Sequence, residues 1–420
     1  MKYNELRTPS YIIQEGKLRE NLEILHNVEE KAGCKILLAQ KAFSMYKTYP
    51  LISKYLSGTT ASGIYEARLS HEEFGENKEN HVFEPAYKSN EMKVLADICS
   101  HIYFNSISQL ECHRKIWEPK VSKGLVKIAL RINPEFSTQE GHEIYDPCST
   151  GSRLGIRKCN LPKTLPSGVT GLHFHTLCEQ GLQPLIDTFR SVEDNFPEYL
   201  ETVSWINLGG GHHITKKDYD VNGLIDFIKE IKAKWNLEVY LEPGEAIALD
   251  AGTLITTVLD IVDTEDMTTL ILDASAACHM PDVIEMPYTP PLFGALEEES
   301  DESEESKESE ESKESEGSKE SEESDVTPNK GKSGVKSYKV RLASRTCLAG
   351  DVIGIYCLPE VPSVGDILTF GDMAIYSMVK NNTFNGMALP DIVLEHDSDL
   401  EDRFEIVKQF DYLDFKMRLS

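Results

Sequence analysis

Short runs of apolar, β-branched and aromatic residues alternate with amphipathic stretches over the first 245 residues. We expect eight of these runs to be strands: 35–40, 58–62, 81–85, 101–105, 126–132, 169–175, 203–208 and 238–243. Most of the gaps between them have a helical pattern, as in 64–74, 89–99 and 223–235. Strands that alternate with helices predict βαβ units and a parallel sheet. Eight units match a (β/α)8 TIM barrel, although a doubly wound sheet shows the same alternation.

The pattern changes near residue 246. Runs such as 252–262, 268–274 and 337–344 are rich in β-formers and separated by Gly and Asp, with little helical periodicity. This texture predicts a separate all-β, β-barrel-like domain. We therefore divide the chain into an N-terminal segment at 1–15 that joins the β-domain, an α/β barrel at 16–246 and a β-domain at 247–420.

A charged repeat interrupts the predicted β-domain. Residues 297–325 include 14 Glu, 2 Asp and 3 Lys, and four related hexads run from 302 to 325. The repeat has no apolar residue to bury, so we expect 297–334 to be a disordered insertion. Serine recurs at every third position. Each phosphorylated serine would therefore place a negative charge three residues after the preceding serine. A regulatory role of this kind is a hypothesis.

Composition excludes several classes of protein. The net charge is −27, of which the repeat carries 13, so the rest has an ordinary acidic surface. Nucleic acid is not an expected partner because it requires a basic face, whereas a cationic substrate is compatible. No apolar run approaches the length of a membrane span, and the first residues lack the apolar core of a signal peptide. Nine cysteines without a CxxC pair argue against a disulfide framework, so we expect a reduced, cytoplasmic protein.

Unusual residues fall where the predicted barrel strands end, which is where chemistry gathers in such barrels. Lys41 follows the first strand, in ILLAQKAFS, His175 ends the sixth and Glu242 ends the eighth. Unpaired burial of an ammonium group is costly, so a lysine after an apolar run needs an explanation. Each of the three residues alone has a purely structural explanation. Lys41 could extend its ammonium group to solvent, His175 could be an ordinary core residue, and Glu242 could cap the next helix. Their common position at one face favours a site.

Three glycines, Gly209, Gly210 and Gly211, follow the seventh strand. The dinucleotide fingerprint needs a glycine at the sixth position, where this chain has Ile214, so a Rossmann NAD site is disfavoured. Glycine backbone groups can approach an anion closely, and barrels commonly bind phosphate near strands seven and eight. A tight turn explains the glycines equally well.

These parts together match the needs of pyridoxal phosphate (PLP). A lysine binds its aldehyde, an aromatic side chain stacks on its ring, and a carboxylate keeps its pyridine nitrogen protonated so that the ring accepts electrons. The histidines have no metal-binding spacing such as HExxH, so we expect no metal.

The motifs LLAQKAFS, TTASGIYEA, GLHFHTLCEQ, NLGGGHHIT, YLEPGEAIALD and CLAGDVIG occur in this order. Together they resemble the PLP decarboxylases of the alanine-racemase fold (fold-type III), the family of ornithine and diaminopimelate decarboxylases. The resemblance covers almost the whole chain except the acidic repeat. It implies a PLP-binding barrel with a β-domain, and a head-to-tail homodimer whose active sites lie at the interface.

The resemblance implies roles for individual residues. Lys41 matches the lysine that forms the Schiff base with PLP, and Cys347 matches the cysteine of the partner subunit that protonates the substrate carbon. His175 matches the ring-stacking histidine and Glu242 the carboxylate on the pyridine nitrogen. Residues 209–211 match the phosphate-binding glycines.

Three further positions match the family pattern. Tyr376 corresponds to a tyrosine near the phosphate, and Arg153 to a basic residue near the ring hydroxyl. Asp351 corresponds to the aspartate that follows the cysteine, and we count it among the substrate-binding residues.

Two departures point to the carboxynorspermidine decarboxylase branch of the family. Glu245 stands where ornithine and diaminopimelate decarboxylases have an arginine, and Leu348 where they have an acidic residue. We expect Glu245 and Asp282 to contact the polyamine arm of a substrate, although a turn residue after Pro281 is a competing role for Asp282.

The implied reaction is PLP-dependent decarboxylation of carboxynorspermidine or carboxyspermidine to norspermidine or spermidine in polyamine biosynthesis. A diaminopimelate decarboxylase is disfavoured by Glu245 and Leu348, and an alanine racemase has no reason for the CLAGD element. A non-catalytic PLP-binding regulator of polyamine synthesis would be expected to lose Lys41 or Cys347, and both are present.

Overall fold

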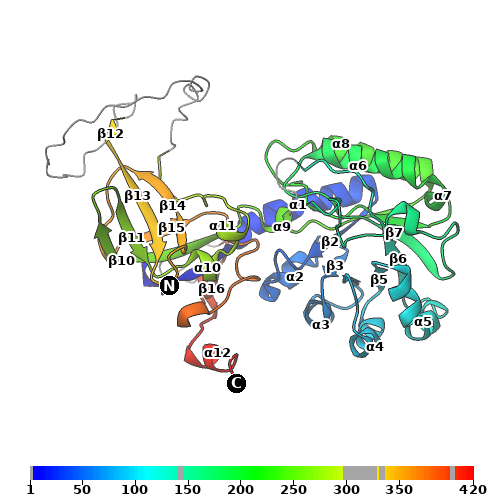
Figure 1. Ribbon diagram of the computed structural model, residues 1–420, viewed down its shortest axis with the longest axis horizontal. Coiled ribbons are helices and arrows are strands. Elements are labelled where there is room, and N and C mark those ends of the chain that lie inside the picture. Colours follow the sequence, from blue (N-terminus) through cyan, green and yellow to red (C-terminus); the bar gives the residue numbers. More distant parts are fainter. Residues whose placement is uncertain (1–2, 140–145, 297–328, 331–335, 398–402) are drawn as a thin grey trace, which may run out of the picture.

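The computed structural model describes residues 3–139, 146–296, 329–330, 336–397 and 403–420. Two lobes lie side by side, a barrel and a sheet domain, and the long helix α1 (Glu15–Ala32) runs from one toward the other (Figure 1). The insertion expected at 297–334, with its phosphorylation hypothesis, lies outside the described residues except for 329–330.

A closed parallel barrel forms the first lobe. Its strands are β2 (Lys35–Ala39), β3 (Gly58–Ala61), β4 (Glu79–Phe83), β5 (His101–Phe104), β6 (Lys127–Arg131), β7 (Val169–His173), β8 (Trp205–Asn207) and β9 (Glu238–Leu241). The last strand pairs in parallel with the first, so this sheet has no edge. The predicted (β/α)8 barrel is confirmed, and closure excludes the doubly wound alternative.

Helices cover the outside of the barrel. They are α1, α2 (Tyr49–Ile52), α3 (Ile64–Glu73), α4 (Ser89–Ile98), α5 (Ile107–Val121), α6 (Leu182–Asn195), α7 (Pro197–Leu200) and α8 (Val221–Trp235). In α8, the Asp220 side chain accepts a backbone N–H at the start, and left-handed Asn236 ends the helix. Leu224, Ile228 and Ile231 recur at helical spacing and are buried against the barrel.

A nine-stranded mixed sheet forms the second lobe. Its strands are β1 (Ser10–Gln14), β10 (Gly252–Asp263), β11 (Thr268–Leu272), β12 (Asn329–Lys330), β13 (Lys336–Ser344), β14 (Val352–Leu358), β15 (Ile367–Phe370), β16 (Asp391–Glu395) and β17 (Phe404–Lys408). The predicted C-terminal sheet domain is confirmed. Strand β1 pairs with β10 and β16 of this sheet, far from it in sequence. The domain boundaries themselves stay a prediction.

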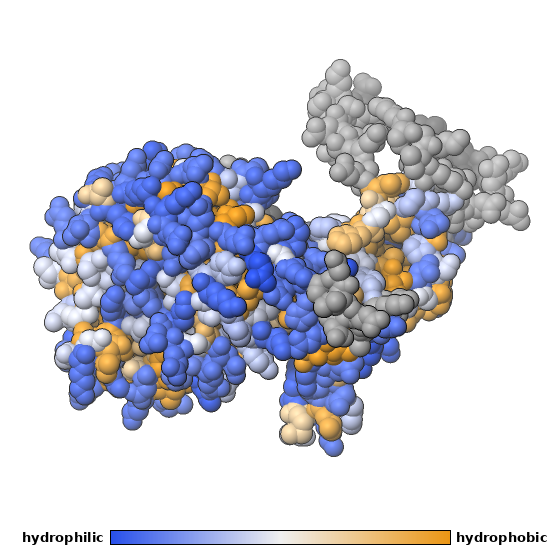
Figure 2. Space-filling view, turned by 180° about the vertical axis from the view of Figure 1, so that it is seen from behind, coloured by the Kyte–Doolittle hydropathy of each residue, from blue (hydrophilic) through white to orange (hydrophobic). Residues whose placement is uncertain are grey.

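Short helices complete the molecule. They are α9 (Glu245–Ala248), α10 (Ala276–His279), α11 (Asp282–Glu285) and α12 (Tyr412–Lys416). Seen from behind, the barrel surface is mainly hydrophilic with scattered apolar patches, an ordinary pattern (Figure 2). Among the described helices, none combines the length and apolar character that a bilayer span requires.

Alternate side chains of the barrel strands enter two different cores. Leu37, Tyr103, Ala129, Trp205 and Tyr240 form a cluster of their own inside the barrel. Their neighbours along the same strands join the larger core beneath the helices. This two-residue period means that every second residue of a strand points to the barrel axis, and the last of these side chains face the mouth.

One histidine links the two lobes. His396 follows β16, and its ring nitrogens lie 2.8 Å from Glu15 at the start of α1 and 3.2 Å from Glu405 in β17. The hydrogen bond with Glu15, then that with Glu405, raises the pKa of His396. A raised pKa stabilises the fold fully below the ordinary histidine value, and this contribution is lost as the pH rises through the folded value.

We therefore expect His396→Gln to lower the free energy of unfolding at about pH 5.5 by about 0.5 kcal/mol, a modest value because the ring is one-third exposed. The loss should vanish at about pH 9, where the wild-type ring is neutral. Urea unfolding at both pH values measures this, with His71→Gln, on the exposed surface of α3, as the control. A loss of equal size at both pH values contradicts the assignment.

Candidate active site

A pocket of about 250 Å³ opens at the carboxyl ends of the barrel strands. The structure brings six of the residues singled out in the sequence into its lining: Lys41, His175, Gly211, Glu242, Glu245 and Tyr376. They come from five separate places in the chain, and only the closed barrel makes them neighbours.

Lys41 follows β2 at the floor of the pocket. Its Nζ lies 3.2 Å from Nε2 of His175. The side chain has surface open to the pocket, yet burial among protein atoms, and then the charge of Arg131, lowers the pKa of Lys41. A lowered pKa increases the fraction of neutral amine, which is the form that attacks a carbonyl carbon.

His175 presents a neutral ring to the same pocket. Its Nδ1 accepts the N–H of Gly210 at 3.1 Å, so the proton of the neutral imidazole lies on Nε2, toward Lys41. Burial and then the neighbouring Lys41 hold the pKa of His175 well below its usual range. An uncharged flat ring in this position suits stacking on an aromatic ligand.

The three glycines satisfy strict geometric demands. Gly209 and Gly211 have φ of +71° and +87°. A Cβ on Gly210 would lie 2.0 Å from the carbonyl oxygen of Glu242. The N–H groups of Gly209 and Gly210 already bond to side chains, and Gly211 lines the pocket. The glycines therefore form a tight turn and also permit a close backbone approach, and of the three it is Gly211 that lines the pocket.

Glu242 provides an ionised carboxylate. Its Oε1 accepts from Nδ2 of Asn207 at 2.8 Å, and its Oε2 lies 3.4 Å from Nε2 of His173. Burial opposes ionisation, but His173, then His81 and the Thr60 hydroxyl, lower the pKa of Glu242 to about 2. A negative charge at the end of β9 can therefore bind a protonated ring nitrogen.

Arg131, at the end of β6, is a pocket residue that the sequence did not reveal. It is buried, lies 4.5 Å over the ring of Phe83 and donates to the carbonyl of His175 at 2.9 Å. Burial lowers the pKa of Arg131 to about 10. Arg153, expected near the ring hydroxyl, is instead exposed and absent from this lining. The sequence could have indicated Arg131 only through its position two residues after Ala129, on the side of the strand that faces the barrel interior.

The two carboxylates expected to bind a polyamine have cationic neighbours. A carboxylate oxygen of Glu245, at the start of α9, lies 2.6 Å from Nε2 of His213. Burial lowers the pKa of His213, but this hydrogen bond and the charge of Glu245 raise it by more. Asp282, at the start of α11, is paired with Lys380, although burial still raises the pKa of Asp282. Glu245 lines the pocket, whereas Asp282 lies outside its lining but close enough for the charge of Glu245 to raise its pKa. We call these two carboxylates the acidic rim.

Glu179 is a further acidic residue near this rim. It follows Cys178, which lines the pocket, and it is held at φ +53°, an uncommon conformation for glutamate. Burial, and then the charge of Glu245, raises the pKa of Glu179. The sequence could have indicated Glu179 through its position in the motif HTLCEQ, four residues after His175.

Cys347 and Asp351 lie elsewhere in the chain. Cys347, between β13 and β14, is exposed and lines a different cavity of about 540 Å³. Asp351 is buried and accepts from the hydroxyls of Ser275 and Thr346 and the N–H of Ala277. Its carboxylate therefore holds the Cys347 loop, and a substrate contact of Asp351 stays a prediction.

Comparisons with known proteins agree with this geometry. A family described as pyridoxal-dependent decarboxylase, C-terminal sheet domain, matches residues 64–374. The carboxynorspermidine/carboxyspermidine decarboxylase of Campylobacter jejuni is 37% identical over the full length of both chains. The carboxyaminopropylagmatine decarboxylase of Synechocystis is 36% identical, over all of this chain and 97% of the relative.

Solved structures give the same result. Carboxynorspermidine decarboxylase from Campylobacter jejuni, complexed with norspermidine, has a TM-score of 0.81 at 35% identity and covers 98% of this chain and 100% of its own. Diaminopimelate decarboxylase from Helicobacter pylori, complexed with L-lysine, has a TM-score of 0.77 at 17% identity, covering 100% of this chain and 99% of its own, and shows the fold alone. The chain therefore belongs to the pyridoxal-dependent decarboxylases that combine a barrel with a C-terminal sheet domain.

Proposed function

We propose that this enzyme decarboxylates carboxylated polyamines, converting carboxynorspermidine or carboxyspermidine to norspermidine or spermidine and CO₂. The observation that carries the proposal is one pocket that Lys41, Glu242 and Glu245 line together. Relatives that are 36–37% identical over the full chain act on substrates of this class.

The pocket residues fit PLP. The amine of Lys41 suits its aldehyde, the neutral ring of His175 its aromatic face, and the ionised Glu242 its pyridine nitrogen. Gly211 and Tyr376, in the same lining, would hold its phosphate. When bound, PLP supplies the electron sink for the loss of CO₂.

The acidic rim favours a substrate that carries ammonium groups. Beyond the effect of burial, the charges of Glu245 and Asp282 raise the pKa of Glu179, and the charge of Glu245 raises the pKa of Asp282. Among the described contacts Glu245 and Asp282 have cationic partners and Glu179 has none. A positively charged arm would relieve this repulsion, whereas the second carboxylate of diaminopimelate would add to it.

A second substrate has specific support. The Synechocystis relative, named a carboxyaminopropylagmatine decarboxylase, is almost as similar as the Campylobacter enzyme. A guanidinium group would also pair with the carboxylate rim, with bidentate geometry. We keep carboxyaminopropylagmatine as the alternative substrate.

We infer a homodimer with shared active sites from the place of Cys347. The thiol is exposed and borders a cavity other than that of Lys41, so a second copy can receive it in its pocket. In that arrangement Cys347 of one subunit returns a proton to the substrate carbon held over Lys41 of the other. A cytoplasmic location stays part of the proposal.

The direct test is CO₂ release by the purified protein with PLP. We expect kcat/KM for carboxynorspermidine or carboxyspermidine to exceed that for diaminopimelate and ornithine by about 10²-fold or more, because the acidic rim attracts a cationic arm and repels a second carboxylate. Carboxyaminopropylagmatine belongs in the same series. A preference for diaminopimelate would overturn the proposal, and a preference for carboxyaminopropylagmatine would select the alternative.

Mixing two inactive variants tests the shared site. Lys41→Ala should lose activity and the visible absorbance of bound PLP, whereas Cys347→Ala should keep the absorbance and lose most activity. After unfolding and refolding together in equal amounts, half of the dimers have one intact site, so about a quarter of wild-type activity should return. No recovery in the mixture, with normal thermal unfolding of both variants, contradicts a site built from two subunits.

Neutralising the rim should weaken substrate binding. We expect Glu179→Gln and Glu245→Gln each to raise KM for carboxynorspermidine about tenfold, with kcat less affected, because the contact is present in the ground state and the transition state alike. Steady-state kinetics measures this. Glu198→Gln on the exposed surface of α7 is the matched control and should leave both constants unchanged. Unchanged KM in both rim variants would remove these residues from the substrate site.

A further inference from the structure

The interior of the barrel contains several buried polar side chains where aliphatic ones would be expected. TIM-barrel interiors are dominated by bulky branched aliphatic side chains. Here His81, Tyr103 and Asn207, on β4, β5 and β8, are all fully buried inside the barrel. They lie between the pocket at one end and a charged cluster at the other.

These three residues form a continuous hydrogen-bonded chain. His81 Nε2 lies 2.8 Å from Oε2 of Glu79, and His81 Nδ1 lies 2.5 Å from the hydroxyl of Tyr103. Asn207 Nδ2 donates to that hydroxyl at 2.8 Å and to Oε1 of Glu242 at 2.8 Å. The chain therefore connects a carboxylate near the amino ends of the strands with the carboxylate of the pocket.

The donors and acceptors are consistent with one direction along the chain. The Asn207 amide uses both N–H groups, so the Tyr103 hydroxyl accepts from it, and the hydroxyl can donate its own proton to Nδ1 of a neutral His81 ring. Burial raises the pKa of Tyr103 well above its usual range, so that proton is retained. His81 then has its proton on Nε2 and donates to Glu79.

Asn207 is the point where this chain meets the pocket. Its Oδ1 accepts the N–H of Gly209 at 2.8 Å while its Nδ2 holds Glu242. A flipped amide would lose Gly209 and place an oxygen against the carboxylate. The amide thus ties the glycine turn to Glu242, and Tyr103 keeps the amide in that orientation.

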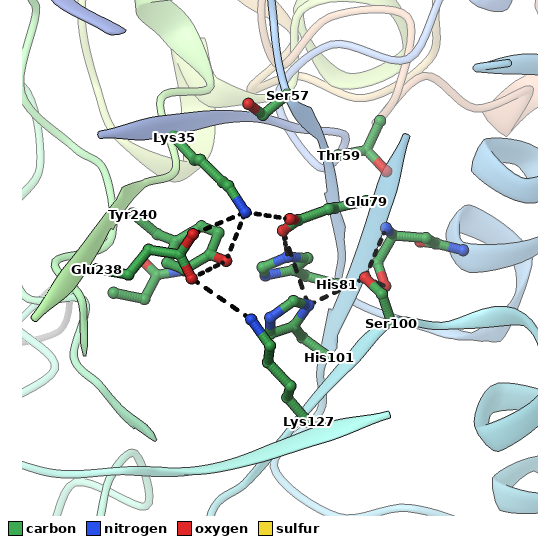
Figure 3. A network of polar contacts seen from close by, with 12 residues as sticks. Lys35, Ser57, Thr59, Glu79, His81, Ser100, His101, Lys127, Glu238 and Tyr240 are labelled. Atoms are coloured by element: carbon green, nitrogen blue, oxygen red, sulfur yellow. Dashed lines mark hydrogen bonds and ion pairs between the residues drawn. The ribbon is translucent and has the colours of Figure 1, made fainter. Parts of the chain in front are cut away.

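The far end of the chain is anchored by charge. Lys35 points at Glu79 and lies 2.8 Å from Glu238, which in turn faces Lys127 (Figure 3). Burial opposes ionisation of Glu79, but its hydrogen bond with His81 and, less strongly, that with Lys35 lower the pKa of that carboxyl. Both ends of the chain are therefore anionic acceptors.

A metal site is the competing explanation for this end. Glu79, His81 and His101 offer ligand atoms within 4.8 Å of one another. However, the rings of His81 and His101 stack 3.8 Å apart at 21°, so their in-plane lone pairs do not converge on one ion. The ammonium of Lys35 already pairs with Glu79. The geometry therefore favours a charge anchor over a metal centre.

We propose that His81 and Tyr103 are positioning residues of the active site, which act through Asn207 to hold the orientation of the Glu242 carboxylate in the pocket. The inference rests on the proposed place of PLP against Glu242. Neither residue lines the pocket. Without the Tyr103 hydroxyl, one N–H of Asn207 and Nδ1 of His81 lose their partner, and the buried amide is free to turn.

The test compares Tyr103→Phe with Tyr240→Phe. Both remove one hydroxyl from the same inner cluster, but the Tyr240 hydroxyl bonds to Glu238 and Lys35, away from Glu242. We expect Tyr103→Phe to weaken binding of PLP to the apoenzyme and to lower kcat, each about tenfold, with KM little changed. It should also shift the pH dependence of the absorbance of bound PLP, and Tyr240→Phe should do none of these.

Two results separate the possible failures. If the wild-type protein decarboxylates none of the substrates in the series, the proposed function fails, while PLP affinity and absorbance still report on the positioning role. If Tyr103→Phe and Tyr240→Phe have equal PLP affinity and the same absorbance profile, the positioning role is overturned, whatever their thermal stabilities.

Two substitutions at His81 test whether restoring the hydrogen-bond acceptor also restores PLP affinity. His81→Asn can keep an acceptor near the place of Nδ1 for the Tyr103 hydroxyl, whereas His81→Leu cannot. We expect His81→Asn to recover most of the PLP affinity that is lost in His81→Leu. Equal affinity in the two variants would overturn the role of His81.

Discussion

The buried, ionised carboxylate of Glu242 is the constraint on which the rest of the site depends. Moving a carboxylate out of water is costly unless hydrogen bonds compensate it. Asn207 donates to one oxygen, and His173 lies 3.4 Å from the other. Because β8 and β9 are adjacent parallel strands, residues at their carboxyl ends meet beside the pocket, and closure of the barrel fixes their separation.

This constraint accounts for the polar interior of the barrel. Asn207 can serve Glu242 only if its own orientation is fixed, which the Gly209 N–H and the Tyr103 hydroxyl achieve. Tyr103 in turn needs an acceptor for its proton, and His81 supplies it. Each buried polar group therefore requires the next, until the chain reaches Glu79 near solvent and the ammonium of Lys35.

Features that depend on local pattern and on the ends of strands were predictable from the sequence. Lys41, His175 and Glu242 could be grouped because parallel barrel strands all end at one face. Arg131 was missed because its inward direction depends on register, and Arg153 was favoured because it lies in a recognisable motif. The inner chain joins His81, Tyr103 and Asn207, whose contacts exist only after closure, so no single-sequence period can show it. Fold and family are confirmed, whereas individual roles stay predictions.

The two ends of the chain also differ in what balances their charge. Glu79 has a cation of the protein, Lys35, beside it. Glu242 accepts a hydrogen bond from Asn207, which has no charge, and burial lowers the pKa of His173 beside it. A protonated pyridine ring would therefore be the cation that matches Glu242, and its binding would stabilise the folded barrel through the same carboxylate that it needs for chemistry. In this arrangement cofactor affinity, barrel stability and electron withdrawal by the ring all depend on one ion pair.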